Sequence, residues 1–80
     1  MAQKVVKSPY PGTFYMRPNP DADPYVSDGD PVSRGDVIGL VEIMKTFQEV
    51  KSEEEGIADR FLVENEQLID VGQEILLLRD

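Results

Sequence analysis

The chain alternates short apolar segments with turn-forming residues and has no sustained helical period. Breaks at Gly and Pro recur at roughly 6 to 12 residue intervals, which is typical of all-β sandwiches and barrels. Residues 61–71 could also be scored as a short amphipathic helix, but the spacing of turn residues favours strands. We therefore expect strands at residues 4–8, 13–15, 37–42, 46–51, 57–64, 68–70 and 74–78.

The run of residues 37–50 is too long to be a single strand. It contains 14 mostly apolar and β-favouring residues interrupted by Gly39, whereas strands usually have about three to ten residues. A chain reversal must therefore fall inside it. Two-residue hairpin turns normally use Gly, Asn or Asp, because both central residues take positive φ, and Met44-Lys45 offers none of these. Such a local violation of turn chemistry suggests a functional site.

The chain contains an imperfect internal repeat. A shift of 37 residues superposes Val26, Gly29, Val32, Gly35, Ile38 and Leu40 on Val63, Glu66, Ile69, Gly72, Ile75 and Leu77. Gly12 pairs with Gly56 at a shift of 44, so the first half carries seven extra residues. Two similar β-halves, each too small to bury its own apolar face, predict two packed antiparallel sheets with pseudo-two-fold symmetry.

The repeat also makes two positional predictions. Lys45 shifted by 37 falls just beyond the C-terminus, so the lysine turn should lie at the end opposite both chain termini. Glu66 stands where the repeat expects glycine. If position 66 keeps positive φ, glutamate costs about 1 kcal/mol there, partly relieved if Asn65 takes the strained geometry instead.

Residues 16–24, with the sequence MRPNPDADP, interrupt the first half. Proline fixes φ and biases the preceding residue toward extended geometry, so we expect a stiff, ordered protrusion. A flexible linker is the alternative, but linkers are uncommon inside so small a domain.

Composition narrows the function. We expect one domain over residues 1–80. A net charge of −8, from 16 acidic and eight basic residues, disfavours nucleic-acid binding and suits either solubility or attraction to basic docking surfaces. The chain has no Cys and no His, and its serines therefore lack an imidazole base, so we expect no catalytic or zinc site. The acidic residues near 21–30 do not follow the EF-hand spacing. No stretch is apolar enough for a signal peptide or membrane span, which predicts a cytoplasmic protein.

Lys45 is the side chain with the most specific chemical implication. A lone lysine is ordinarily a solvated surface residue. At the tip of a rigid hairpin, flanked by Met44 and Thr46 with Phe47 nearby, its amine suits acylation by another enzyme, which would remove the charge and create a swinging arm.

Three stretches carry a resemblance to a known family: SPYPGTFY, PNPDADPY and the Met-Lys turn. Together they resemble the biotinyl domains of the biotin carboxyl carriers of acetyl-CoA carboxylase, over residues 8–78. The resemblance implies a flattened β-barrel of two four-stranded sheets. It also implies a protruding "thumb", here about residues 16–24, beside the cofactor.

The same resemblance implies the site and the partners. Biotin would be attached to Lys45, Met44 and Thr46 would flank it, and the thumb would supply Arg17, Pro18, Asn19 and Pro20. The chain would be a non-catalytic carrier in fatty acid biosynthesis, charged by biotin carboxylase, discharged by carboxyltransferase and modified by biotin protein ligase. Ile43 and Thr46 depart from the family's usual Ala-Met-Lys-Met or Leu.

Two alternatives remain open from sequence. Lipoyl carriers share the implied fold, but usually have Asp-Lys-Ala at the turn and lack the thumb. The other alternative is an interaction module in which Lys45 is unmodified.

Overall fold

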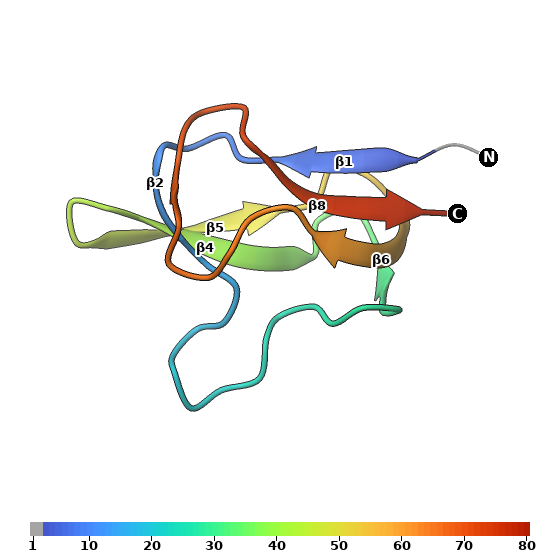
Figure 1. The fold of residues 1–80 in the computed structure, drawn as a ribbon, viewed down its shortest axis with the longest axis horizontal. Helices are drawn as coiled ribbons and strands as arrows, with labels where there is room; N and C mark the ends of the chain where they lie inside the picture. Colours follow the sequence, from blue (N-terminus) through green and yellow to red (C-terminus); the bar gives the residue numbers. More distant parts are fainter. Residues whose placement is uncertain (1–2) are drawn as a thin grey trace.

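Two four-stranded antiparallel sheets form the architecture (Figure 1). The structure, a computed structural model, describes residues 3–80, so the first two residues of the predicted 1–80 domain lie outside the described part. Its strands are β1 (Lys4–Lys7), β2 (Gly12–Tyr15), β3 (Pro31–Val32), β4 (Val37–Ile43), β5 (Thr46–Lys51), β6 (Gly56–Phe61), β7 (Leu68–Ile69) and β8 (Glu74–Arg79). One sheet has the order β1-β8-β6-β3 and the other β5-β4-β2-β7. The predicted all-β class with two four-stranded sheets is confirmed.

The internal repeat maps one sheet onto the other. Shifts of 37 residues carry β3 and β4 onto β7 and β8, and shifts of 44 carry β1 and β2 onto β5 and β6. The two strand orders then coincide position by position. Turn hydrogen bonds repeat as well: Gly35 N donates to Ser52 O at 2.8 Å, and Gly72 N donates to Ser8 O at 2.7 Å. Pseudo-two-fold symmetry therefore extends from the sequence pattern to the backbone.

The two symmetry-related serines are buried turn residues. Ser8 Oγ donates to Tyr10 O at 2.7 Å and accepts from Tyr10 N at 3.1 Å. Ser52 Oγ makes the same pair of bonds with Glu54, at 2.7 Å and 3.2 Å. Because a buried hydroxyl without partners is costly, these bonds explain why serine is tolerated there. These two hydroxyls therefore hold the turns that follow them.

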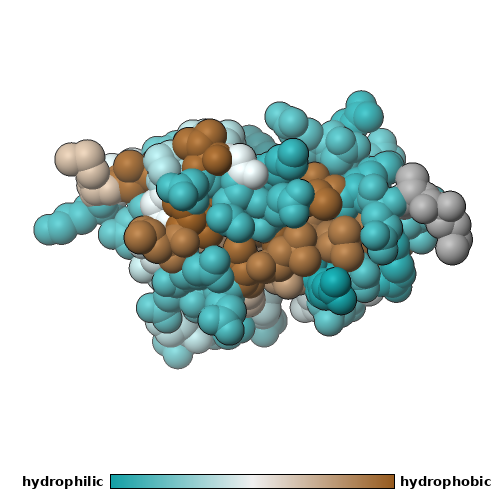
Figure 2. All heavy atoms as spheres, turned by 45° about the horizontal axis from the view of Figure 1, so that its top comes forward, coloured by the Kyte–Doolittle hydropathy of each residue, from teal (hydrophilic) through white to brown (hydrophobic). Residues whose placement is uncertain are grey.

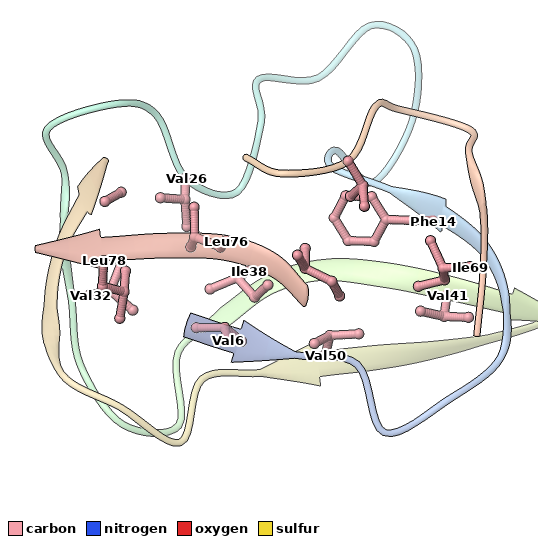
Figure 3. Close-up of a cluster of buried hydrophobic side chains, with 13 residues drawn as sticks. Val6, Phe14, Val26, Val32, Ile38, Val41, Val50, Ile69, Leu76 and Leu78 are labelled. Atoms are coloured by element: carbon pink, nitrogen blue, oxygen red, sulfur yellow. The ribbon is translucent and has the colours of Figure 1, made fainter. Parts of the chain in front are cut away.

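The core lies between the two sheets (Figure 3). Alternating residues along the strands point inward, as the period of two in a β-strand requires, except where the register shifts at Ile38 in β4 and at Ile75 in β8, which are both buried. Burying each large aliphatic or aromatic side chain contributes about 1.5–3 kcal/mol. The largest fully buried apolar side chains come from both sheets: Phe14, Ile38, Val41, Val50, Ile75, Leu76 and Leu78.

The observed strands differ from the predicted ones by more than one residue in two places. β3 was not predicted, because it is two residues long and begins with Pro31, a residue that sheets tolerate at the start of a strand. β6 ends at Phe61 and not at residue 64, since the chain then enters a turn in which Glu64 N donates to Gln67 Oε1 at 2.9 Å and Gln67 N to Glu64 O at 3.2 Å. The helical alternative for residues 61–71 is wrong, because β7 pairs with β2 there.

The turn between β4 and β5 projects from one end of the molecule, and the start of β1 and the C-terminus lie at the other (Figure 1). The predicted separation of the lysine turn from the chain ends is confirmed. A carrier tethered through its ends would therefore present Lys45 away from the tether.

Glu66 keeps the positive φ of its glycine counterpart, as predicted. Its φ is 68°, against 91° for Gly29. Glu66 N donates to Phe14 O at 2.6 Å, and Gly29 N makes the equivalent bond to Ala58 O at 2.7 Å. Relief of the strain through Asn65 is wrong, because Asn65 has no positive φ. Its side chain instead accepts a hydrogen bond from Met16 N at 2.9 Å.

We predict that Glu66→Gly raises the free energy of unfolding by about 0.5 kcal/mol, the relieved strain of about 1 kcal/mol less the greater chain entropy of glycine. The midpoint should rise by roughly 2–4 °C in a thermal melt. Gly29→Glu, which has no neighbouring atoms to meet, is the symmetric control and should lower the midpoint. A lower midpoint for Glu66→Gly would contradict the strain at position 66.

Candidate functional site

The lysine hairpin is a two-residue turn held by a long ladder. Glu42 pairs with Phe47 and Ile43 with Thr46, which leaves Met44 and Lys45 as the loop. Their φ values are 49° and 68°. Both central residues therefore take the left-handed geometry of a type I′ turn without Gly, Asn or Asp. Each such residue costs about 1 kcal/mol or more, so the neighbouring β4–β5 pairs must impose the turn.

The turn places its side chains in solvent. Met44 is 94% exposed, and Lys45 and Thr46 are exposed as well. Within residues 3–80, Lys45 Nζ has no hydrogen bond or ion pair. In Figure 2 the hairpin stays at the left end, and apolar atoms lie at the surface there as well as in a band across the middle of the face shown. The amine is thus accessible beside apolar side chains that another protein can contact.

Aromatic and acidic side chains brace the base of the hairpin. Tyr15 on β2 donates its hydroxyl to Glu42 Oε1 at 3.1 Å, and its ring lies 5.9 Å from that of Phe47, at a tilt of 59°. The hydrogen bond to Glu42, together with the nearby negative charges of Glu42 and Glu66, raises the pKa of Tyr15. These contacts tie β2, β4 and β5 together below the lysine.

The thumb, residues 16–24, is an internally hydrogen-bonded loop. Tyr25 N donates to Met16 O at 3.0 Å and closes the loop. At its tip, Asn19 Oδ1 accepts from Asp21 N at 3.0 Å and Asn19 O from Ala22 N at 3.1 Å. These bonds favour the stiff protrusion predicted from the prolines over a flexible linker.

A cavity of about 240 Å³ lies between the thumb and the base of the hairpin. All four predicted thumb residues line it, and so do four others: Arg17, Pro18, Asn19 and Pro20 with Tyr15, Phe47, Asn65 and Glu66. Lys45, Met44 and Thr46 are not among the lining residues, but Phe47 lies two positions beyond Lys45. The structure thus brings the thumb residues together and leaves the lysine at the adjoining tip.

Sequence reasoning missed Tyr15, Asn65 and Glu66 as cavity residues. The repeat contained the necessary signal, because residues 64–67 correspond to 27–30, and each turn bonds to a strand of the facing half. That pairing places the 64–67 turn against the end of β2, where the thumb begins.

A second hollow, of about 760 Å³, opens beside β5 and includes Pro9, Tyr10 and Lys51 in its lining. It is larger, but it does not adjoin the thumb, and Phe47 is the residue that both linings share. We place the candidate site at the smaller cavity because it joins the thumb to the lysine hairpin. In the part of the chain that the structure describes, no group of acidic side chains is arranged to hold a metal ion, and no helix is long and apolar enough to cross a membrane.

Fold and site together define a pseudo-symmetric β-sandwich that presents one lysine on a strained hairpin beside an inserted loop. Residues 4–78 match the family model described as "Biotin-requiring enzyme". The chain belongs to this family, and the family resemblance inferred from its motifs is confirmed.

Several curated relatives are biotin carboxyl carrier proteins of acetyl-CoA carboxylase. The protein from Streptococcus pyogenes is 35% identical over 75 residues, covering 94% of this chain and 45% of the relative. The Pseudomonas aeruginosa protein is 35% identical over 74 residues, covering 92% and 47%. The Porphyra purpurea protein is 37% identical over 72 residues, covering 90% and 46%. The chain therefore spans less than half the length of these relatives.

Among solved structures, the crystal structure of Kluyveromyces lactis urea carboxylase contains a similar fold. The TM-score is 0.76 at 23% sequence identity, over 99% of this chain and 6% of the larger one. At this identity the match supports the fold.

Relaxing the hairpin should stabilise the protein. We expect the double variant Met44→Asn, Lys45→Gly to raise the free energy of unfolding by about 1 kcal/mol, because Asn-Gly adopts the type I′ turn with little strain. Urea unfolding measures the change. Thr46→Gly, which places glycine in the adjoining strand, is the control and should be destabilising. An unchanged or lower unfolding free energy for the double variant would show that the turn is not strained.

The Tyr15 hydroxyl should make stability depend on pH in the alkaline range. Because the folded-state pKa of Tyr15 is raised above its ordinary value of 10.0, its contribution is present below about pH 10 and is lost as pH rises through the folded pKa. Thermal melts of wild type and Tyr15→Phe are compared from neutral to alkaline pH. The contribution of the other tyrosines to the pH dependence is common to both proteins and cancels in the difference. The wild type should lose stability relative to the variant at high pH, and a constant difference between them would contradict the Tyr15–Glu42 hydrogen bond.

Proposed function

We propose that this chain is a biotin carboxyl carrier domain, with biotin joined through an amide bond to Lys45 Nζ. In this role it carries a carboxyl group from a biotin carboxylase to the carboxyltransferase of an acyl-CoA carboxylase, with acetyl-CoA as the expected substrate, in fatty acid biosynthesis. The observation that carries the proposal is the positive φ of Met44 and Lys45 in a family that requires biotin. Lys45 is displayed on a turn whose two central residues adopt a backbone geometry that Met and Lys disfavour.

The chemistry at Lys45 suits amide formation. The amine has no competing ion pair within residues 3–80. It stands on five consecutive β4–β5 pairs, from Gly39–Val50 to Ile43–Thr46, that keep one register. Acylation removes its charge without breaking a described contact. Bound biotin supplies a ureido nitrogen that can accept and release a carboxyl group, while the protein supplies a defined point of attachment.

The neighbouring residues have distinct proposed roles. Met44 and Thr46, exposed on either side of the lysine, give a ligase a recognisable surface. Thumb residues Arg17, Pro18, Asn19 and Pro20 line the adjoining cavity and limit the motion of the cofactor. Phe47 and Tyr15 form its aromatic wall, so a bicyclic ring has an apolar surface on which to rest.

In this proposal the domain is a non-catalytic carrier. It has no His or Cys, so proton transfer and carboxylation are left to the partner enzymes. The carrier contributes effective concentration by visiting two active sites on one tether. Its net charge of −8 favours basic docking surfaces on biotin carboxylase, carboxyltransferase and biotin protein ligase over nucleic acid. A cytoplasmic location, without membrane attachment, goes with these partners.

Modification by a ligase tests the proposal. The protein is produced with a biotin protein ligase and excess biotin, and intact-mass and peptide mass spectrometry locate any adduct. We expect one biotin on Lys45, none in Lys45→Arg, and unchanged modification in Lys51→Arg, which alters an exposed lysine at the far end of β5. Unmodified wild type, or biotin that persists in Lys45→Arg, would overturn the proposal. Parallel incubation with a lipoyl ligase distinguishes a lipoyl carrier from an unmodified interaction module.

A further inference from the structure

Arg17, at the root of the thumb, is partly buried and makes no described hydrogen bond or ion pair. In residues 3–80, its Nε is the one buried side-chain nitrogen or oxygen without a hydrogen bond. The guanidinium also forms no ion pair within this range, where Arg79 and Asp59 make the described salt bridge. A buried donor left unpaired is costly, and more so when it belongs to a charged group. Arg17 therefore has unused capacity to bind an anion.

The cavity around Arg17 limits what that anion can be. Its volume of about 240 Å³ is below the roughly 300–1,000 Å³ of sites for drug-sized ligands, so it suits a small group. Phe47, Tyr15 and two prolines form much of the wall, and apolar walls strengthen a charged hydrogen bond by excluding water. Asn19 and Asn65 add amide groups to the lining. A planar carboxylate matches both the size and the fork-shaped donors of a guanidinium.

We propose that Arg17 binds a small carboxylate in the thumb cavity, and that this carboxylate is the carboxyl group that the domain transports. The assignment of the transported group rests on the proposed function. Arg17 then acts as a positioning residue: it holds the negative charge of the transported group against the carrier, beside the thumb. Lysine could not replace it fully, because its single ammonium lacks the paired donors.

Glu66 lines the same cavity, and its negative charge limits the affinity of the cavity for an anion. Its carboxylate repels a bound anion and competes for Arg17, although the two residues do not form an ion pair in the structure. Glu66 also occupies its position at positive φ, where glycine would be less strained. Neutralising Glu66 should therefore strengthen anion binding, whereas neutralising Arg17 should abolish most of it.

The first experiment needs no cofactor. Unmodified protein, labelled with ¹⁵N, is titrated with acetate at constant ionic strength, and with acetamide as the neutral isostere. The Nε–H resonance of Arg17 and the amides of Phe47 and Asn65 report binding. We expect a saturable response to acetate alone, about tenfold weaker in Arg17→Gln, partly restored in Arg17→Lys and severalfold tighter in Glu66→Gln. Arg34→Gln, the same charge change at an exposed turn, is the control and should bind like wild type.

The second experiment uses biotinylated protein. The Arg17 Nε–H resonance is recorded before and after loading with carboxyl groups from biotin carboxylase, ATP and ¹³C-bicarbonate. We expect a shift on loading that is larger than the shift on biotinylation alone.

The outcomes separate the two proposals. Equal responses to acetate and acetamide, or equal binding by wild type and Arg17→Gln, would overturn the anion site whether or not Lys45 carries biotin. Failure of Lys45 to accept biotin would overturn the transported carboxyl as the ligand even if acetate binds. An unchanged Arg17 resonance on loading would also overturn the transported carboxyl as the ligand, but it would not affect the proposal that Lys45 carries biotin.

Discussion

The hydrogen-bonded ladder between β4 and β5 is the constraint on which the proposed site depends. Five consecutive pairs next to the turn hold the two strands in register and force Met44 and Lys45 into positive φ. Neither residue favours that geometry by itself, so without the ladder a rearranged turn would have a lower conformational free energy. The ladder in turn relies on the core beneath it, since Val41 and Val50 on its inner face are fully buried. Packing between the sheets therefore supports the β4–β5 ladder, and the ladder fixes the position of Lys45.

The duplicated architecture explains how so short a chain achieves this stiffness. Each half closes its turns with the same bonds, down to the buried hydroxyls of Ser8 and Ser52. Where the halves differ, the differences collect at one end of the molecule. The first half carries the thumb, and the second carries Glu66 in place of glycine, and both border the cavity that adjoins the lysine hairpin.

Much of this arrangement could be predicted from the sequence, because it follows from local patterns. The repeat predicted two sheets and the position of the lysine turn, and the absence of turn residues at 44–45 pointed to the site. Short strands were harder: β3 has only Pro31 and Val32, too few residues for any periodicity. The cavity itself was not predicted. It forms where Tyr15 of β2, Phe47 of β5 and Glu66 of the turn before β7 lie beside the thumb, and the strand patterns do not show which side chains the thumb covers.

The unpaired Nε of Arg17 could not be predicted from the sequence either, because an arginine in a proline-rich loop is expected to be solvated. Its burial depends on the 64–67 turn lying beside the thumb root, where Asn65 accepts a bond from Met16 N. Such features arise from tertiary contacts, so no sequence motif predicts them.

We propose that the strained turn exists to present Lys45 for biotin attachment. Site-resolved mass spectrometry of the protein isolated from its own cells is the direct test. We expect biotin on the peptide that contains Met44 and Lys45. An unmodified Lys45 in cells whose other biotin proteins are fully modified would contradict it.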